Sequence, residues 1–199
     1  MTCPRTDQAV GLFGGSFNPA HAGHLHVAKT ALKALDLDEI WWMVSRQHPL
    51  KPEQPDYETR VATVLNLPLA PRMRISHMEP DFGTSYTRDT LRRARIRWPH
   101  ARFVFVMGAD NFLQLPKWRG WHEIMHTVPV LVISRPDRGS RAIRARLGKA
   151  AVIYRQARIP EWQAHTLKDL TAPAWTFLTK PLNPLCSSAI RAAGNSGQF

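Results

Sequence analysis

The chain has 199 residues, 44% of them hydrophobic and 21% charged, which is ordinary for a soluble globular protein that buries a core in one domain. No apolar run approaches the roughly 20 residues of a membrane span, no secretory signal is recognisable, and two cysteines are too few for a disulfide framework, so a cytoplasmic location without membrane contact is predicted. The formal net charge of +12 fits nucleic-acid binding, an anionic substrate or simply a basic proteome.

Short apolar runs alternate with helical patterns along the chain. In chain order, the patterns predict a strand over 9–13, a helix over 22–35, a strand over 40–45, a Pro-rich loop over 48–55, a helix over 56–67, a strand over 74–76, a helix over 84–98, a strand over 102–107, short helices over 109–115 and 119–126, a strand over 128–134, a basic helix over 140–149, a strand over 175–179 and a small helix from Ser187. Strands separated by helices require crossovers and favour a parallel sheet. The prediction is an α/β fold, a Rossmann-like, open, mostly parallel sheet with helices on both faces, in one domain over 1–199.

Special residues are densest after the first predicted strand, in the stretch G-L-F-G-G-S-F-N-P-A-H-A-G-H at 11–24. Ligands of such sheets bind at the carboxyl ends of the strands, beside the first strand-to-helix turn. Gly14 and Gly15 are predicted at that turn, where backbone N–H groups can approach an anion and the next helix adds its positive end. His21 and His24 lie three residues apart and are expected to face one pocket as donors to phosphate oxygens. The alternative is a tight turn whose histidines only cap the helix.

This stretch resembles the signature of the nucleotidyltransferase superfamily that shares H-x-G-H with class I aminoacyl-tRNA synthetases, with Asn18 where Asp is usual. A second segment, L-C-S-S-A-I-R at 185–191, is similar to the I-S-S-T-x-I-R motif of that superfamily. Cys186 and Ser188 stand there in place of the usual Ser and Thr. A Ser-rich helix start followed by an arginine forms an anion cradle, and the resemblance implies that it holds the phosphates of ATP.

Three inner segments resemble bacterial nicotinate-nucleotide adenylyltransferases. They are T-S-Y-T-R-D-T-L at 84–91, V-M-G-A-D-N-F-L-Q-L-P-K-W at 106–118 and V-I-S-R-P-D at 132–137. With the two terminal motifs, the resemblance extends from about residue 9 to residue 191. It implies transfer of the adenylyl group of ATP, bound with Mg²⁺, to nicotinate mononucleotide, which yields deamido-NAD and pyrophosphate. The oligomeric state stays open, a homo-oligomer included.

The same resemblance assigns roles to individual residues. The expected catalytic residues are His21, His24 and Arg191. The expected ATP contacts are Gly14, Gly15, Ser16, Phe17, His21, His24, Gly108, Asp110, Ser187, Ser188 and Arg191. The expected nicotinate mononucleotide contacts are Ser16, Lys51, Tyr86, Thr87, Trp118 and Arg135. Asp110 would bond a ribose hydroxyl, Thr87 would meet the nicotinate carboxylate, and Trp118 would stack on the pyridine. No protein ligand for a metal ion is expected.

Other functions remain open at this point. The nearest is adenylyl transfer to nicotinamide mononucleotide or phosphopantetheine. A different class is a basic nucleic-acid-binding domain, although the basic clusters at 92–97 and 138–146 lack interleaved aromatic residues. The stretch H-E-I-M-H at 122–126 formally matches a zinc-protease motif. A strand pattern begins directly after it and no third ligand follows, so a short packing helix is predicted there.

Overall fold

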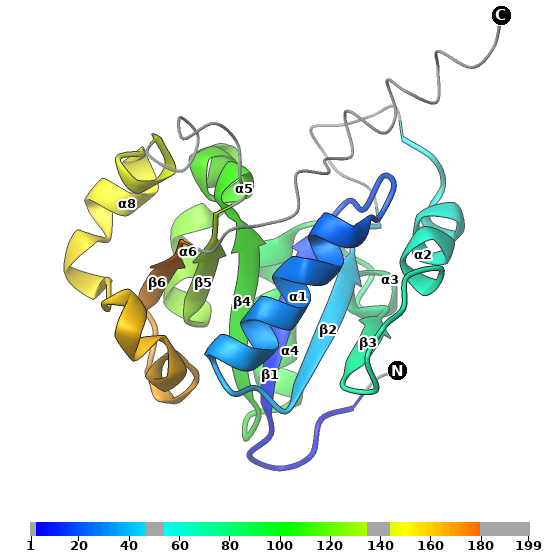
Figure 1. Cartoon of the computed structure of the whole chain (residues 1–199), viewed down its shortest axis with the longest axis horizontal. Coiled ribbons are helices and arrows are strands. Elements are labelled where there is room, and N and C mark those ends of the chain that lie inside the picture. Colours follow the sequence, from blue (N-terminus) through cyan, green and yellow to red (C-terminus); the bar gives the residue numbers. More distant parts are fainter. Residues whose placement is uncertain (1–2, 47–53, 135–143, 180–199) are drawn as a thin grey trace, which may run out of the picture.

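The computed structural model describes residues 3–46, 54–134 and 144–179, and a six-stranded sheet lies at their centre (Figure 1). The strands are β1 (Ala9–Gly15), β2 (Glu39–Val44), β3 (Met73–Ser76), β4 (Arg102–Gly108), β5 (Val130–Ile133) and β6 (Trp175–Leu178). Their order is β3-β2-β1-β4-β5-β6, and every neighbouring pair is parallel. The chain therefore builds outward from β1 to one side and then restarts at β4 on the other. This reversal between β1 and β4 is the strand-order switch of a Rossmann-like sheet.

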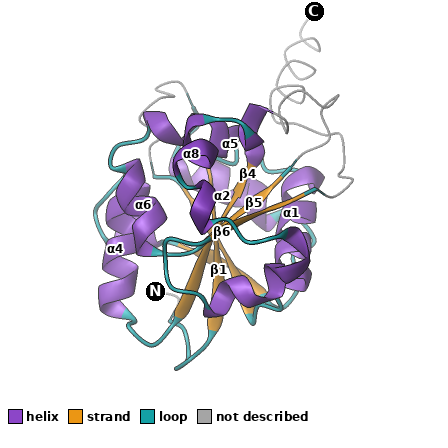
Figure 2. Ribbon diagram, turned by 90° about the vertical axis from the view of Figure 1, so that its left-hand side faces the viewer, coloured by secondary structure: helices purple, strands orange, loops and turns teal. Residues whose placement is uncertain are grey.

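Helices cover both faces of this sheet, as predicted. They are α1 (Ala22–Ala34), α2 (Tyr57–Leu65), α3 (Met78–Asp81), α4 (Thr87–Arg97), α5 (Ala109–Gln114), α6 (Trp121–Thr127) and α8 (Lys149–Ile153), with 3-10 segments at Leu115–Lys117, Arg155–Ala157 and Glu161–Asp169. Figure 2 shows α4 and α6 on one side of the strands and α1 on the other. None of the helices in the described ranges is both long and apolar enough to cross a membrane.

Side-chain alternation along β1 divides the core into two layers. Val10 and Leu12 point into the cluster that contains the buried residues of α4 and α6. Ala9 and Phe13 point to the opposite face and pack with α1 and α2. Successive residues of a strand face opposite sides, so a strand between two helical layers must be apolar throughout. That requirement explains why the central strands read as continuous apolar runs.

Some predicted boundaries are wrong in informative ways. β1 continues through Gly15, which pairs with Val44, so both glycines end the strand and the turn begins at Ser16. β5 starts at Val130 because Pro129 has no N–H to donate to the ladder. The helix expected from residue 84 begins at Thr87, three residues late.

The remaining differences concern short elements. The sequence did not predict α3 or the 3-10 segments after residue 154. The helix α3 and the segment Arg155–Ala157 are about one turn long, and the nine-residue segment Glu161–Asp169 repeats every three residues and so lacks the 3.6-residue period of an α-helix. The predicted helix over 140–149 begins outside the described residues, and α8 starts where it was expected to end. The predicted last helix from Ser187 also lies outside the described residues.

Candidate active site

The carboxyl ends of β1 and β4 lie next to each other at one edge of the sheet. The two strands pair in parallel from Ala9 opposite Arg102 to Phe13 opposite Val106. The glycines that end them, Gly15 and Gly108, each lie two residues beyond the last pair of this ladder, at the strand-order switch. Ligands of open parallel sheets bind in the crevice at this point, and the predicted ATP contacts at Gly14, Gly15 and Gly108 are all found there.

His21 and His24 lie side by side at the start of α1, as predicted. Their ring centroids are 3.9 Å apart, and both side chains are buried, with 4% and 6% of their surface exposed. His21 is the N-cap residue, and its Nδ1 accepts a hydrogen bond from the N–H of Gly23 at 3.1 Å. The Nδ1 of His24 accepts from the N–H of His21 at 3.3 Å. Capping and pairing thus occur together, so the two interpretations of these histidines are compatible.

These two hydrogen bonds from backbone N–H groups also determine the tautomer of each imidazole. A ring nitrogen that accepts a hydrogen bond carries no proton, so a neutral ring whose Nδ1 accepts must hold its proton on Nε2. This applies to both His21 and His24. In each neutral ring, Nε2 is then the donor, and the backbone of α1 has set this arrangement before any ligand binds. Two such donors at a helix N-terminus suit an anion.

Phe17 bends the chain between β1 and α1. Its φ of 45° lies in the left-handed region, which costs a bulky residue free energy unless packing compensates. The ring is 1% exposed and packs against Phe13, Trp42 and His24 with centroid distances of 5.1 to 5.3 Å. Since the ring belongs to the core, any contact between Phe17 and a nucleotide must come from its backbone.

The two glycines before this turn are also required by packing inside the protein. A Cβ on Gly14 would lie 2.8 Å from the ring of Phe105, and a Cβ on Gly15 would lie 2.9 Å from the ring of Phe17. Neither distance leaves room for a methyl group. The glycine density of the signature therefore has a structural cause in addition to the approach of an anion that the sequence suggested.

A second group of candidates follows β4. Gly108 is buried at the end of the strand and is the N-cap residue of α5. Asp110 lies in the first turn of that helix and is partly exposed. Asp110 therefore follows β4 at the switch, while the two histidines follow the neighbouring strand β1. This position is compatible with the expected bond to a ribose hydroxyl.

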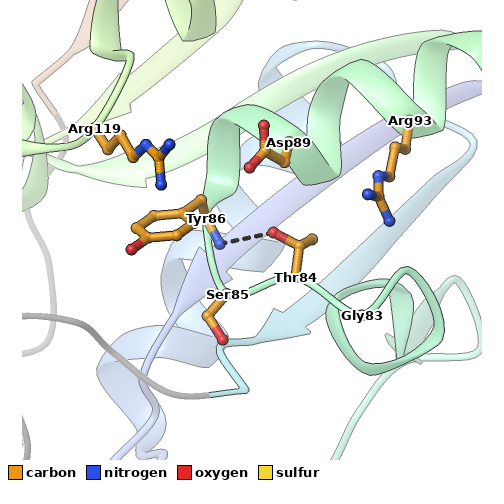
Figure 3. Close-up of a pocket in the computed structure, with 7 residues that line it drawn as sticks. All are labelled: Gly83, Thr84, Ser85, Tyr86, Asp89, Arg93 and Arg119. Carbon is orange, nitrogen blue, oxygen red and sulfur yellow. Dashed lines mark hydrogen bonds between the residues drawn. The ribbon is translucent and has the colours of Figure 1, made fainter.

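A cavity of about 480 Å³ opens beside the N-terminus of α4. Its walls are formed by Gly83, Thr84, Ser85, Tyr86, Asp89, Arg93 and Arg119 (Figure 3). Within it, the N–H of Tyr86 donates to the hydroxyl of Thr84 at 3.1 Å. The guanidinium of Arg119 stacks on the Tyr86 ring, with its carbon 4.8 Å from the ring centroid. The volume is within the range of small-ligand pockets.

Among the predicted nicotinate mononucleotide contacts that fall in the described residues, Tyr86 alone lines this cavity. Thr87 follows it as the first residue of α4, and Trp118, which packs partly buried against the core, precedes Arg119. Sequence reasoning missed Arg119 and Arg93 because arginines on a polar stretch are usually solvated. The cavity instead brings together two cations that are 26 residues apart in the chain.

Five predicted contacts lie outside the described residues: Lys51, Arg135, Ser187, Ser188 and Arg191. The H-E-I-M-H stretch forms α6, as predicted, and the Nδ1 of His122 lies 2.9 Å from the hydroxyl of Tyr154. Within the ranges that the structure describes, no group of three or more His, Cys, Asp or Glu side chains could hold a metal ion.

The strand order and the histidine pair at its switch point together define a Rossmann-like nucleotide-binding protein of the nucleotidyltransferase type. The chain belongs to the cytidylyltransferase-like family, which matches residues 12–193. The predicted superfamily is thereby confirmed.

Relatives of known name cover nearly the whole chain. A probable nicotinate-nucleotide adenylyltransferase of Caulobacter sp. (strain K31) is 48% identical over 190 residues, which are 94% of this chain and 99% of the relative. A protein of the same name from Ruegeria sp. (strain TM1040) is 46% identical over 186 residues, 93% of this chain and 97% of the relative.

Solved structures confirm the fold. The nicotinic acid mononucleotide adenylyltransferase of Plasmodium falciparum complexed with NaAD superposes with a TM-score of 0.68 at 16% identity, over 92% of this chain and 82% of that one. The same enzyme complexed with APC gives a TM-score of 0.67 over 93% and 83% of the two chains.

Proposed function

We propose that this protein transfers the adenylyl group of ATP to nicotinate mononucleotide, forming deamido-NAD and releasing pyrophosphate. The observation that carries the proposal is the pair of backbone-capped imidazoles, His21 and His24, at the strand-order switch. The substrate class comes from the relatives, which are named for this reaction and match over more than nine-tenths of the chain.

In the proposed reaction, the phosphate of nicotinate mononucleotide attacks the α-phosphorus of ATP in line. A new P–O bond forms as the bond from that phosphorus to the oxygen bridging to the β-phosphate breaks, and the electron pair leaves with pyrophosphate. A phosphate is already a competent nucleophile at neutral pH, so the reaction requires neither a strong base nor a covalent enzyme intermediate. Catalysis then consists of positioning and of stabilising charge on the phosphoryl oxygens.

The histidine Nε2 donors would supply that charge stabilisation. ATP would enter as its magnesium complex, with the ion held by phosphate oxygens and water. Asp110 and Gly108 would hold the adenosine, and Ser16 would contact both substrates. Ser187, Ser188 and Arg191 would retain the leaving pyrophosphate, while Lys51 and Arg135 would contact the mononucleotide. The positive net charge of +12 suits two anionic substrates.

The cavity beside α4 is the proposed site of the nicotinate ring. The carboxylate of nicotinate would meet Arg119 and the backbone at Thr87, at the positive end of α4. Trp118, one residue before Arg119, would offer its ring face to the pyridine. The amide substrate carries no charge for Arg119 to pair with, so the acid is expected to be preferred.

The test is pyrophosphate release by the purified protein with ATP and Mg²⁺, comparing nicotinate mononucleotide with its amide. His21→Asn is the most informative variant, because Asn is a good N-cap residue but lacks the imidazole donor. We expect His21→Asn and His24→Ala each to lower kcat by about 100-fold or more. His26→Ala, on the same helix but outside the pair, is the matched control and should retain activity. Full activity in His21→Asn would reduce that histidine to a helix cap.

Absence of turnover with either acceptor would refute the proposed reaction. Phosphopantetheine is then the next acceptor to test. Binding of duplex DNA that persists at moderate salt, without pyrophosphate release, would favour the nucleic-acid-binding alternative.

A further inference from the structure

An arginine on α2 is buried where three loop segments meet. Arg60 is 1% exposed, and its guanidinium donates to three backbone carbonyls. Nε bonds to Pro55 O at 3.0 Å, one terminal nitrogen to Ser16 O at 2.9 Å, and the other to Arg46 O at 2.9 Å. Only arginine offers a rigid planar set of donors that can serve three directions at once.

Two of these carbonyls lie directly beyond neighbouring strands of the sheet. Ser16 directly follows β1 and begins the turn that leads to His21, and Arg46 lies two residues after the end of β2. Both backbone polar groups of Arg46 are hydrogen-bonded. Its N–H donates to the Glu79 carboxylate at 2.7 Å, and its carbonyl accepts from Arg60. Arg60 therefore connects the chain segments that leave β1 and β2.

A second side chain of α2 contacts the same turn three residues later. The hydroxyl of Thr63 accepts a hydrogen bond from the N–H of Ala20 at 3.0 Å. It also lies 2.7 Å from the carbonyl of Arg60 and 3.3 Å from that of Phe17. Arg60 and Thr63 are three residues apart on one helix face. Together they hold the turn at its first residue, Ser16, and at Ala20, directly before the N-cap histidine.

We propose that Arg60 is a positioning residue that acts through the Ser16–Ala20 turn to hold His21 in its catalytic place, with Thr63 as its partner. This inference rests on the proposed function, since it concerns the same site. The geometry favours positioning over plain stabilisation for a physical reason. The hydrogen bonds of the Arg60 guanidinium go to carbonyls, and the Glu79 carboxylate attracts it through space. A cation buried in this way is a costly means of stabilising a core, and apolar residues often serve as well. The carbonyls it selects are those of the loops that bear candidate substrate contacts.

The control is Arg72, an exposed arginine that, like Arg60, donates to a backbone carbonyl, Leu37 O at 3.1 Å. Arg72 directly precedes β3 and Leu37 lies two residues before β2, so this bond ties the chain at the opposite, amino-terminal edge of the sheet. Arg72→Lys thus removes an arginine-to-carbonyl bond without touching the catalytic edge.

The experiment compares Arg60→Lys, Thr63→Val and Arg72→Lys with the parent protein at a temperature where melting curves show each one fully folded. We expect kcat to fall about 100-fold in Arg60→Lys and about 10-fold in Thr63→Val, with KM for both substrates within about threefold, because a displacement near 1 Å has effects of this size. In the ligand-free proteins, amide hydrogen exchange in a peptide covering 14–24 should accelerate in these two variants and not in Arg72→Lys.

Unchanged kcat in Thr63→Val and Arg60→Lys would overturn the inference, and so would a fall in kcat without faster exchange in 14–24. If Arg60→Lys does not fold, Thr63→Val decides by the same criteria. Should the parent protein show no turnover, the proposed function fails, and the exchange measurement alone decides whether α2 holds the turn.

Discussion

Replacing Glu79 by Gln probes a buried carboxyl group that stands apart from the catalytic pair. Glu79 is 4% exposed, and its Oε2 accepts the N–H of Arg46 at 2.7 Å. Burial raises the pKa of Glu79 from 4.5 to about 7, and this outweighs the opposing effects of the Arg46 hydrogen bond and of the nearby Arg60 charge. The carboxyl group is therefore partly protonated at neutral pH in the folded protein.

The sign of the pH effect follows from the two pKa values. Between pH 4.5 and about 7, the folded state binds more protons at Glu79 than the unfolded chain does, so the free energy of unfolding decreases as pH rises. At about 1.4 kcal/mol per pKa unit, the shift is worth about 3 kcal/mol, most of it lost between pH 5 and pH 8. This dependence is opposite to that of an ion-paired surface carboxylate.

The assay is urea unfolding of the parent protein and Glu79→Gln at pH 5 and pH 8. The neutral amide keeps an oxygen for the Arg46 N–H, so the variant should gain about 2 to 3 kcal/mol relative to the parent between the two pH values. Glu58→Gln, at an exposed position of α2, is the control and should show no such gain. An equal difference at both pH values, or a variant that becomes relatively weaker at pH 8, would refute this account of Glu79.

Two further substitutions test the geometry around the candidate substrates. In Gly15→Ala, the new methyl group would lie 2.9 Å from the Phe17 ring, which packs on His24, so kcat should fall at least tenfold and the free energy of unfolding should drop by about 1–3 kcal/mol. Steady-state kinetics measures the first effect and urea titration the second. A normal kcat would show that the Phe17 ring moves aside without disturbing His24. In Arg119→Met, loss of the cation above Tyr86 should raise KM for nicotinate mononucleotide about tenfold and leave KM for ATP unchanged. The ratio of kcat/KM for the acid to kcat/KM for the amide should fall. If steady-state kinetics shows this ratio unchanged, Arg119 does not recognise the substrate.

Much of the fold was predictable because its signals are local. The apolar runs at 102–107 and 128–134 and the helical patterns between runs required a parallel sheet, and the structure has one. The pairing of His21 with His24 was also predictable, since a spacing of three at a helix start brings the two side chains together. His21 nevertheless has an extended backbone, and it meets His24 as the N-cap and N3 residues of a capping box. The ends of the strands and helices were harder to predict. The first strand, for example, was expected to end at residue 13, but pairing with β2 extends it through Gly15.

The sequence by itself determined the class of fold, the family signature and the two histidines, all of which depend on residues close together in the chain. Only the tertiary structure decided that Arg60 is buried, because its three carbonyl partners come from positions 16, 46 and 55. In the sequence, that arginine reads as one more solvated cation on a helix. The same holds for Glu79 and Arg119, whose surroundings are assembled from distant segments. Whether such a side chain is buried, and which distant groups surround it, depends on where the whole chain places these segments. No local pattern in the sequence encodes that placement.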